Sequence, residues 1–247
     1  MIAITDDTEG MGEVWRVRRV ATNARIEERP LDAGARSGSG AGTEGQKTGP
    51  VLISGWKPFS DVDIDTYLIP PTEAAPNWHI RVHRITSGRS IRTSEGAFAL
   101  EGTRKSDGRE LEALSMSGDE RGQTSPEELA RQNEGVHAKE AEALAVTSAG
   151  AVGIVELLSH KHENTDTSGG SGRTGKVLAM DANSNLIAKR SVMPSLAAEV
   201  KKGETWWWVT AVFAMPESVE GWEGKWRESW QGRPRVPGWV ESMIREG

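Results

Sequence analysis

The sequence contains no cysteine among its 247 residues, which excludes disulfides and thiolate metal sites. It also has no apolar run that approaches the length of a membrane span, so we expect no membrane association. The N-terminal residues lack both the basic region and the long apolar region of a signal peptide. Together these absences predict a cytoplasmic protein.

The sequence also lacks a positive net charge, since 30 Lys and Arg against 36 Asp and Glu give a formal net charge of −6. A protein that neutralises phosphates needs clustered basic residues, so we expect no nucleic-acid partner. The sequence has no phosphate loop, dinucleotide fingerprint or Gly-x-Ser-x-Gly elbow. We therefore expect no cofactor and no metal.

Short apolar or alternating segments predominate, and such segments are typical of β-strands. In chain order they cover 14–20, 51–56, 62–69, 78–85, 90–100, 145–158, 177–180, 185–192 and 205–213. Polar insertions separate some of them at 33–49, 103–143 and 159–175, and the second insertion has a helix start at Ser125. The first and third of these insertions are rich in Gly and Ser. The pattern predicts an all-β fold, an antiparallel β-sandwich over residues 12–215.

The C-terminal residues 216–247 form a tryptophan-rich tail with a short helical segment. Trp222, Trp226 and Trp230 are spaced by four, which on a helix places them in one stripe. We expect this stripe to pack on the domain, and the alternative is that it stacks on sugar rings. Residues 205–213 are apolar on both strand faces, which predicts a cover on each side of that strand.

The segment 78–85 has an apolar face and a polar face, and the polar face carries His79, Arg81 and His83. Arginine can take a carboxylate with two hydrogen bonds, and histidine can hold or move a proton near neutral pH. These residues suit an anionic substrate, with His79 and His83 as candidate catalytic groups and Arg81 as a binding group. The alternative is a solvated outer sheet face. A metal site is disfavoured because Arg81 would repel a cation.

Four further residues are candidates for substrate binding. Asp65 would lie near His83 and orient it if 62–69 pairs with 78–85, and the alternative is an exposed charge ladder. Glu95 precedes Gly96, where a ligand or another backbone could approach closely, and the alternative is a β-bulge. Trp206 and Trp208 are candidate stacking platforms for sugars.

Several motifs resemble those of the DUF2264 proteins, in the C-terminal half of that family. They are Trp56-x-Pro58, Asp61-Val62-Asp63, Trp78-His79-x-Arg81-Val82-His83-Arg84-Ile85, Glu95-Gly96-x-Phe98-Ala99, Asn183-x-Asn185-Leu186-Ile187, Arg190 and Met193-Pro194-x-Leu196. The resemblance covers roughly residues 12–215 and omits the Gly/Ser loops. The DUF2264 proteins are related to glycoside hydrolase family 154, whose known activity is on β-glucuronides.

This resemblance implies a two-part enzyme, with a helical toroid followed by a β-sandwich like that of heparinase-type polysaccharide lyases. In such lyases the sandwich can lend a histidine to a cleft shared with the toroid, and the strand with His79, Arg81 and His83 matches that position. The sequence has no run of amphipathic helices that could build a toroid. We therefore expect a missing N-terminal helical domain as a partner, with Met1 the start of a truncated or split product.

Three functions remain open from the sequence. The first is a β-sandwich domain of a carbohydrate-active enzyme, catalytically incomplete alone, that acts on an acidic oligosaccharide. The second is a stand-alone carbohydrate-binding or interaction module. The third is a complete small polysaccharide lyase in which a histidine or Arg81 neutralises a uronate carboxylate.

Overall fold

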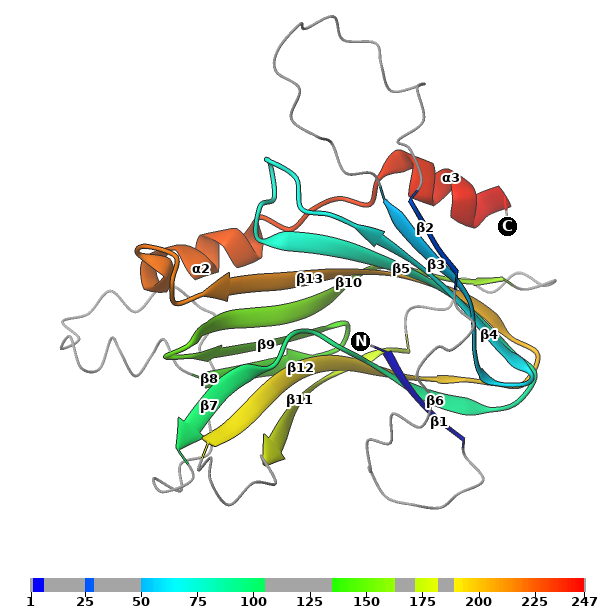
Figure 1. The fold of residues 1–247 in the computed structure, drawn as a ribbon, viewed down its shortest axis with the longest axis horizontal. Helices are drawn as coiled ribbons and strands as arrows, with labels where there is room; N and C mark the ends of the chain where they lie inside the picture. The colour runs from blue at the N-terminus through cyan, green and yellow to red at the C-terminus, as the bar shows by residue number, and fades with distance from the viewer. Residues whose placement is uncertain are drawn as a thin grey trace, which may run out of the picture.

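The computed structural model describes residues 2–6, 25–28, 50–104, 135–162, 172–181 and 189–246. Within these residues two antiparallel β-sheets face one another, and two short helices follow at the C-terminus (Figure 1). The predicted all-β sandwich is therefore confirmed. Three sequence-based expectations lie outside the described residues: the strand at 14–20, the insertion at 33–49 and the helix at Ser125.

The smaller sheet has five strands. In spatial order these are β1 (Ile2–Asp6), β6 (Ile91–Gly96), β12 (Lys189–Val200) and β11 (Thr174–Asp181), and β7 (Leu100–Arg104) also pairs with β12. The larger sheet has eight strands. Its order is β2 (Arg25–Glu28), β3 (Val51–Phe59), β4 (Val62–Ile69), β5 (Trp78–Ser87), β13 (Thr205–Pro216), β10 (Gly150–His162), β9 (Glu142–Thr147) and β8 (Gly135–Lys139).

Several strand boundaries differ from the sequence-based ones. The expected strand at 145–158 is a hairpin, because the chain turns at residues 148–149 and β9 then pairs with β10. Gly150, directly after the turn, has a φ of 128°, which favours glycine. The expected strand at 90–100 is likewise two strands, β6 and β7. Expected loop residues are partly strand, since β8 lies within 103–143 and β10 continues to His162. Residues 2–6 also form a strand, although no strand was expected before residue 14.

The outer face of the eight-stranded sheet is covered by α2 (Trp222–Gln231) and α3 (Gly238–Glu246) (Figure 1). Trp222, Trp226 and Trp230 are buried in one cluster with Trp78, Val82 and Phe213 of the sheet. This cluster supplies the second cover that the two apolar faces of β13 require. In the part of the chain that the structure describes, no helix is long and apolar enough to cross a membrane.

Close packing seats α2 on the sheet. The ring of Trp230 stacks on Trp78 with centroids 5.2 Å apart and also meets Phe213 edge-on. Gly153 of β10 leaves room for the same ring, because a Cβ at that position would lie 2.3 Å from Trp230. Trp78 donates from Nε1 to the carbonyl of Ser229 at 2.8 Å. The helix is therefore an integral layer of the fold.

We expect Trp226→Ala to lower the free energy of unfolding by about 3–5 kcal/mol, because it leaves a large cavity beneath α2. The matched control is Trp239→Ala, which removes a tryptophan that is 39% exposed on α3. Urea unfolding followed by tryptophan fluorescence measures both changes. Equal losses in the two variants would show that α2 is not an integral layer of the fold.

Candidate functional site

The polar face of β5 points into the sandwich, toward the five-stranded sheet. Arg81 donates from Nη1 to the carbonyl of Gly96 on β6 at 2.8 Å. Arg81 is 7% exposed and His83 3% exposed, while the other face of β5 packs under α2. The alternative of a solvated outer face is therefore wrong for these two residues. The chain covers both faces of β5, so its polar row lies in the interior.

The centre of this interior is Glu95 of β6, which is 0% exposed. Its Oε2 accepts hydrogen bonds from Nη2 of Arg173 at 2.7 Å and from Oγ1 of Thr210 at 2.8 Å. Its Oε1 lies 3.1 Å from Nε2 of His83 and 3.7 Å from Nη1 of Arg81. We call the set Arg81, His83, Glu95, Glu156, Arg173 and Thr210 the Glu95 network. It joins the two sheets through one carboxylate.

The register around Glu95 is regular. Glu95 pairs with Leu196 and Gly96 with Ser195, and neither pairing is shifted. The β-bulge considered for this position is therefore absent. Gly96 instead permits close contact with β12, since a Cβ there would lie 2.7 Å from Sδ of Met193.

Arg173, Glu156 and Thr210 are the members of the network that the sequence did not reveal, and Arg173 makes the most contacts among them. Arg173 is fully buried, donates from Nη1 to Thr210 at 3.0 Å, and holds its guanidinium 4.6 Å above the ring of Trp208. Its Nε lies 3.5 Å from Oε2 of Glu156 on β10. Its carbonyl accepts from the amide of Ala141, in the turn between β8 and β9. Nothing in the local sequence marks this arginine, because its partners come from three distant strands.

The charges of the network fix the ionisation of Glu95. Burial alone would raise the pKa of this carboxyl, but the nearby charges of His83, Arg173 and Arg81 outweigh burial. The pKa of Glu95 is therefore held well below its usual range. The guanidiniums of Arg81 and Arg173 lie beside Glu95, and that of Arg173 also lies beside a second buried acid, Glu156. A buried charge is tolerated only when it is paired in this way.

His79 occupies the end of the polar row and is only half-buried. Its Nε2 accepts a hydrogen bond from Nε of Arg81 at 3.1 Å, which requires a neutral imidazole with its proton on Nδ1. Burial, assisted by the charge of Arg81, lowers the pKa of His79 to about 4. The ring of Phe98, which is 47% exposed, lies 5.5 Å away between centroids. His79 is thus a neutral hydrogen-bond donor beside an exposed aromatic ring.

The expected contact between Asp65 and His83 is wrong. The register places Asp65 opposite Arg84, on the outer face of the sheet, and places Thr66 opposite His83. Thr66 Oγ1 and His83 Nδ1 are 2.9 Å apart, so a threonine takes the orienting position. Asp65 instead accepts from the amide of Gly55 at 3.1 Å.

The two candidate stacking tryptophans also lie on the inner face. Trp208 is fully buried among Ile64, Ile85 and Ile91 between the sheets. Trp206 is half-buried beside it and donates from Nε1 to Glu204 at 2.9 Å. A sugar therefore has no access to the ring of Trp208 in this structure.

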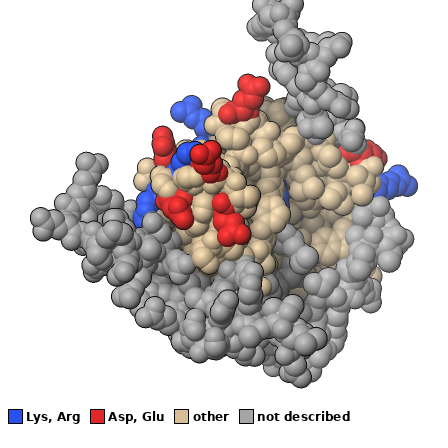
Figure 2. All heavy atoms as spheres, turned by 60° about the vertical axis from the view of Figure 1, so that its left-hand side comes forward, with Lys and Arg blue, Asp and Glu red and all other residues tan. Residues whose placement is uncertain are grey.

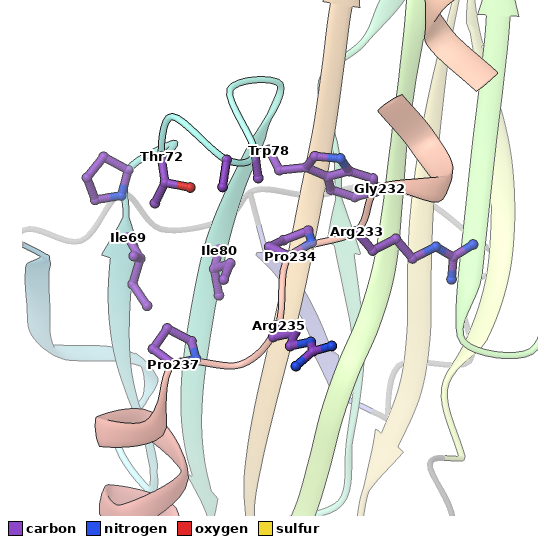
Figure 3. A pocket seen from close by; sticks show the side chains of 12 residues that line it. Ile69, Thr72, Trp78, Ile80, Gly232, Arg233, Pro234, Arg235 and Pro237 are labelled. Carbon is purple, nitrogen blue, oxygen red and sulfur yellow. The ribbon is translucent and has the colours of Figure 1, made fainter. Parts of the chain in front are cut away.

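A groove of about 320 Å³ lies outside the sandwich, between the β4–β5 connection and the segment that joins α2 to α3 (Figure 3). Its wall includes Ile69, Ile80 and Pro237, while the side chains of Arg233 and Arg235 extend away from these residues. The groove therefore offers few polar groups that could orient a ligand. Among the residues that the structure describes, no group of three His, Asp or Glu side chains is arranged to hold a metal ion.

Comparisons with known proteins identify one family. The model of the DUF2264 C-terminal domain matches residues 1–243. No curated protein matches the chain. Among solved structures, the crystal structure of heparan sulfate lyase HepC from Pedobacter heparinus is similar over 68% of this chain, with a TM-score of 0.29 and 11% identity. The match spans 22% of that lyase, and so low a score supports no functional argument.

We expect Glu95→Gln to lower the free energy of unfolding by about 3–5 kcal/mol, because it leaves two buried guanidiniums without their shared carboxylate. The matched control is Glu199→Gln, which removes an exposed acid that lies 3.5 Å from Arg92. That change should stay within about 1 kcal/mol. Chemical denaturation measures both values. A small effect at Glu95 would contradict the structural role of the network.

A second prediction concerns pH. The pKa of His79 is about 4 in the folded chain and near 6.5 when unfolded, so the unfolded chain binds more protons between these values. The contribution of neutral His79 to stability is therefore complete above pH 6.5 and declines as pH falls toward 4. As the pH falls from 6.5 to 4, the free energy of unfolding of the unmodified chain should therefore decrease more than that of His79→Gln. Proton NMR titration of the imidazole gives the folded pKa directly, and a value near 6.5 would refute the assignment.

Proposed function

Because this chain belongs to the DUF2264 C-terminal domain family, we propose that it is the β-sandwich part of a carbohydrate-active enzyme for acidic glycans. In this proposal a helical domain supplies the rest of the catalytic site. The resemblance to two-part glucuronidase-like enzymes supports the proposal. Burial of most of the polar row supports it as well, because the sandwich alone exposes few reactive groups.

The observation that carries the proposal is the hydrogen bond from Arg81 to His79. It fixes the imidazole as a neutral donor at the half-exposed end of the polar row. A neutral imidazole can stabilise developing negative charge on a substrate oxygen through its remaining N–H. We propose that His79 is the catalytic histidine that this sandwich lends to the shared site.

The other candidates then act through His79. His83 contacts Glu95, Glu95 lies beside Arg81, and Arg81 in turn donates a hydrogen bond to the imidazole of His79. In this proposal Arg81, His83 and Glu95 are positioning residues, and none of them touches the substrate. Phe98 is the proposed apolar contact beside His79, for a sugar face or for the helical domain.

Surface charge restricts where an acidic glycan can bind. Figure 2 shows several acidic side chains on the face at the α2 end of the molecule, with fewer Lys and Arg side chains among them. The exposed acids in and near α2 are Glu217, Glu220, Glu223 and Glu228. Anionic sugars are repelled by such a face, so we propose that substrate approaches from elsewhere.

The test is an activity assay of the natural full-length protein that contains this sequence. Its substrates are a glucuronate-terminated oligosaccharide and the matched glucose-terminated compound. We expect turnover of the acidic compound alone, and a loss of at least about a hundredfold in kcat for His79→Ala. The control is Glu199→Gln, which changes an exposed residue of the five-stranded sheet and should leave kcat unchanged.

The products and the isolated chain separate the remaining functions. New reducing ends indicate a hydrolase, whereas new ultraviolet absorbance indicates an unsaturated lyase product. Turnover by the isolated 247-residue chain would favour a complete small lyase over this proposal. Equal binding of both sugars without any turnover would favour a stand-alone binding module. Full activity in His79→Ala would refute the role of His79.

A further inference from the structure

A second row of residues crosses the outer face of the eight-stranded sheet. The antiparallel registers place Asp65 opposite Arg84, Arg84 opposite Trp207, and Trp207 opposite His160. Directly opposed residues of antiparallel strands share a face, so all four lie on the side of β5 away from Glu95. This row is separate from the proposed site at His79.

Arg84 is held in this row without a carboxylate partner among the described residues. Its guanidinium carbon lies 5.7 Å from the centroid of the Trp207 ring, while the side chain is exposed. Asp65 stands opposite in the register, but its carboxylate accepts from the amide of Gly55. Cation–π contact therefore orients Arg84 and leaves its planar donors available.

Two partly exposed arginines that lie over aromatic rings, Arg89 and Arg233, are each paired with a carboxylate. Arg89 over Phe59 pairs with Asp61 at 2.7 Å, and Arg233 over Trp230 pairs with Glu142 at 2.6 Å. Arg84 also lies over an aromatic ring, but no carboxylate of the described residues is paired with it. A guanidinium arranged in this way is suited to a carboxylate supplied by a ligand.

Polar groups beside Arg84 suit the remainder of a sugar. Thr86 and Thr205 are opposed on the same face, with their hydroxyl oxygens 3.1 Å apart. His160 and His162 are exposed on β10, next to Trp207 and Thr205 in the register. Neighbouring strands are about 4.8 Å apart, so Arg84 and His160 lie about 10 Å apart, within reach of one ligand.

We propose that this outer-face patch, formed by Arg84, Thr86, His160, His162 and Thr205, binds a sugar that carries a carboxylate. Arg84 takes the carboxylate, the hydroxyls and imidazoles hydrogen-bond the ring, and buried Trp207 supports Arg84 from below. Two acids lie nearby on this face: Asp63 is paired with Lys57 at 2.7 Å, and Asp65 accepts from the amide of Gly55, and each contact reduces the repulsion of an anion. The patch goes beyond the site at His79, and its ligand class follows from its own donors.

The test is calorimetric titration of the 247-residue chain with a glucuronate-terminated disaccharide, its glucose counterpart and inorganic sulfate. We expect saturable binding of the acidic disaccharide, and at least about tenfold weaker binding in Arg84→Ala, since the lost hydrogen bonds are charge-assisted. Arg84→Lys keeps the positive charge but loses the two parallel N–H donors of the guanidinium. Its affinity should lie between those of the unmodified chain and Arg84→Ala. The control Arg92→Ala removes an exposed arginine from the five-stranded sheet and should leave affinity unchanged.

Each remaining outcome has a definite meaning. Affinity that is unchanged in Arg84→Ala, or lost equally in Arg92→Ala, overturns the patch. Equal affinity for the glucose counterpart or for sulfate overturns the ligand class. Thermal melting of each variant checks that the fold is intact. Binding that survives His79→Gln supports a second site, so this proposal and the one at His79 can fail separately.

Discussion

The fold depends on one buried carboxylate, Glu95, which stands between the two sheets. It can remain ionised there only because Arg173, His83 and Thr210 approach it from other strands and loops. Each partner fixes a different part of the chain against β6. A slip of one sheet over the other would leave buried charge unpaired, which is costly in the interior. The Glu95 network therefore defines how the sheets are stacked.

This constraint gives β5 two unlike faces that are both covered. Its apolar face packs against the tryptophans of α2, and its polar face joins the Glu95 network. On β5, His79 near the start of the strand is half-buried and Arg84 near its end is exposed, so these two side chains reach the surface. These positions lie on opposite faces of one strand. The two proposed contacts with acidic sugars therefore share a rigid support without sharing a ligand.

Much of the architecture was predictable from local pattern. The alternation of apolar and polar residues predicted the bounds of β4 and β5 to within two residues. The spacing of Trp222, Trp226 and Trp230 indicated one helical stripe. The β9–β10 hairpin was not predicted because its turn consists of small residues within a long apolar run, and the antiparallel register of the two strands reveals it. His160 was assigned to a loop because polar composition cannot distinguish an exposed strand end from a turn.

The candidate site was predictable in part. The sequence by itself determined that His79, Arg81 and His83 share one face of a strand, because side chains alternate along a strand. It also indicated a close approach at Gly96, although the neighbour there is the side chain of Met193 and not another backbone. Only the tertiary structure decided that this face points inward, that Thr66 replaces Asp65 beside His83, and that Arg173 completes the charge balance. A strand pattern specifies faces, but the register and the covering layers decide which face meets solvent. Those depend on contacts between residues far apart in the chain.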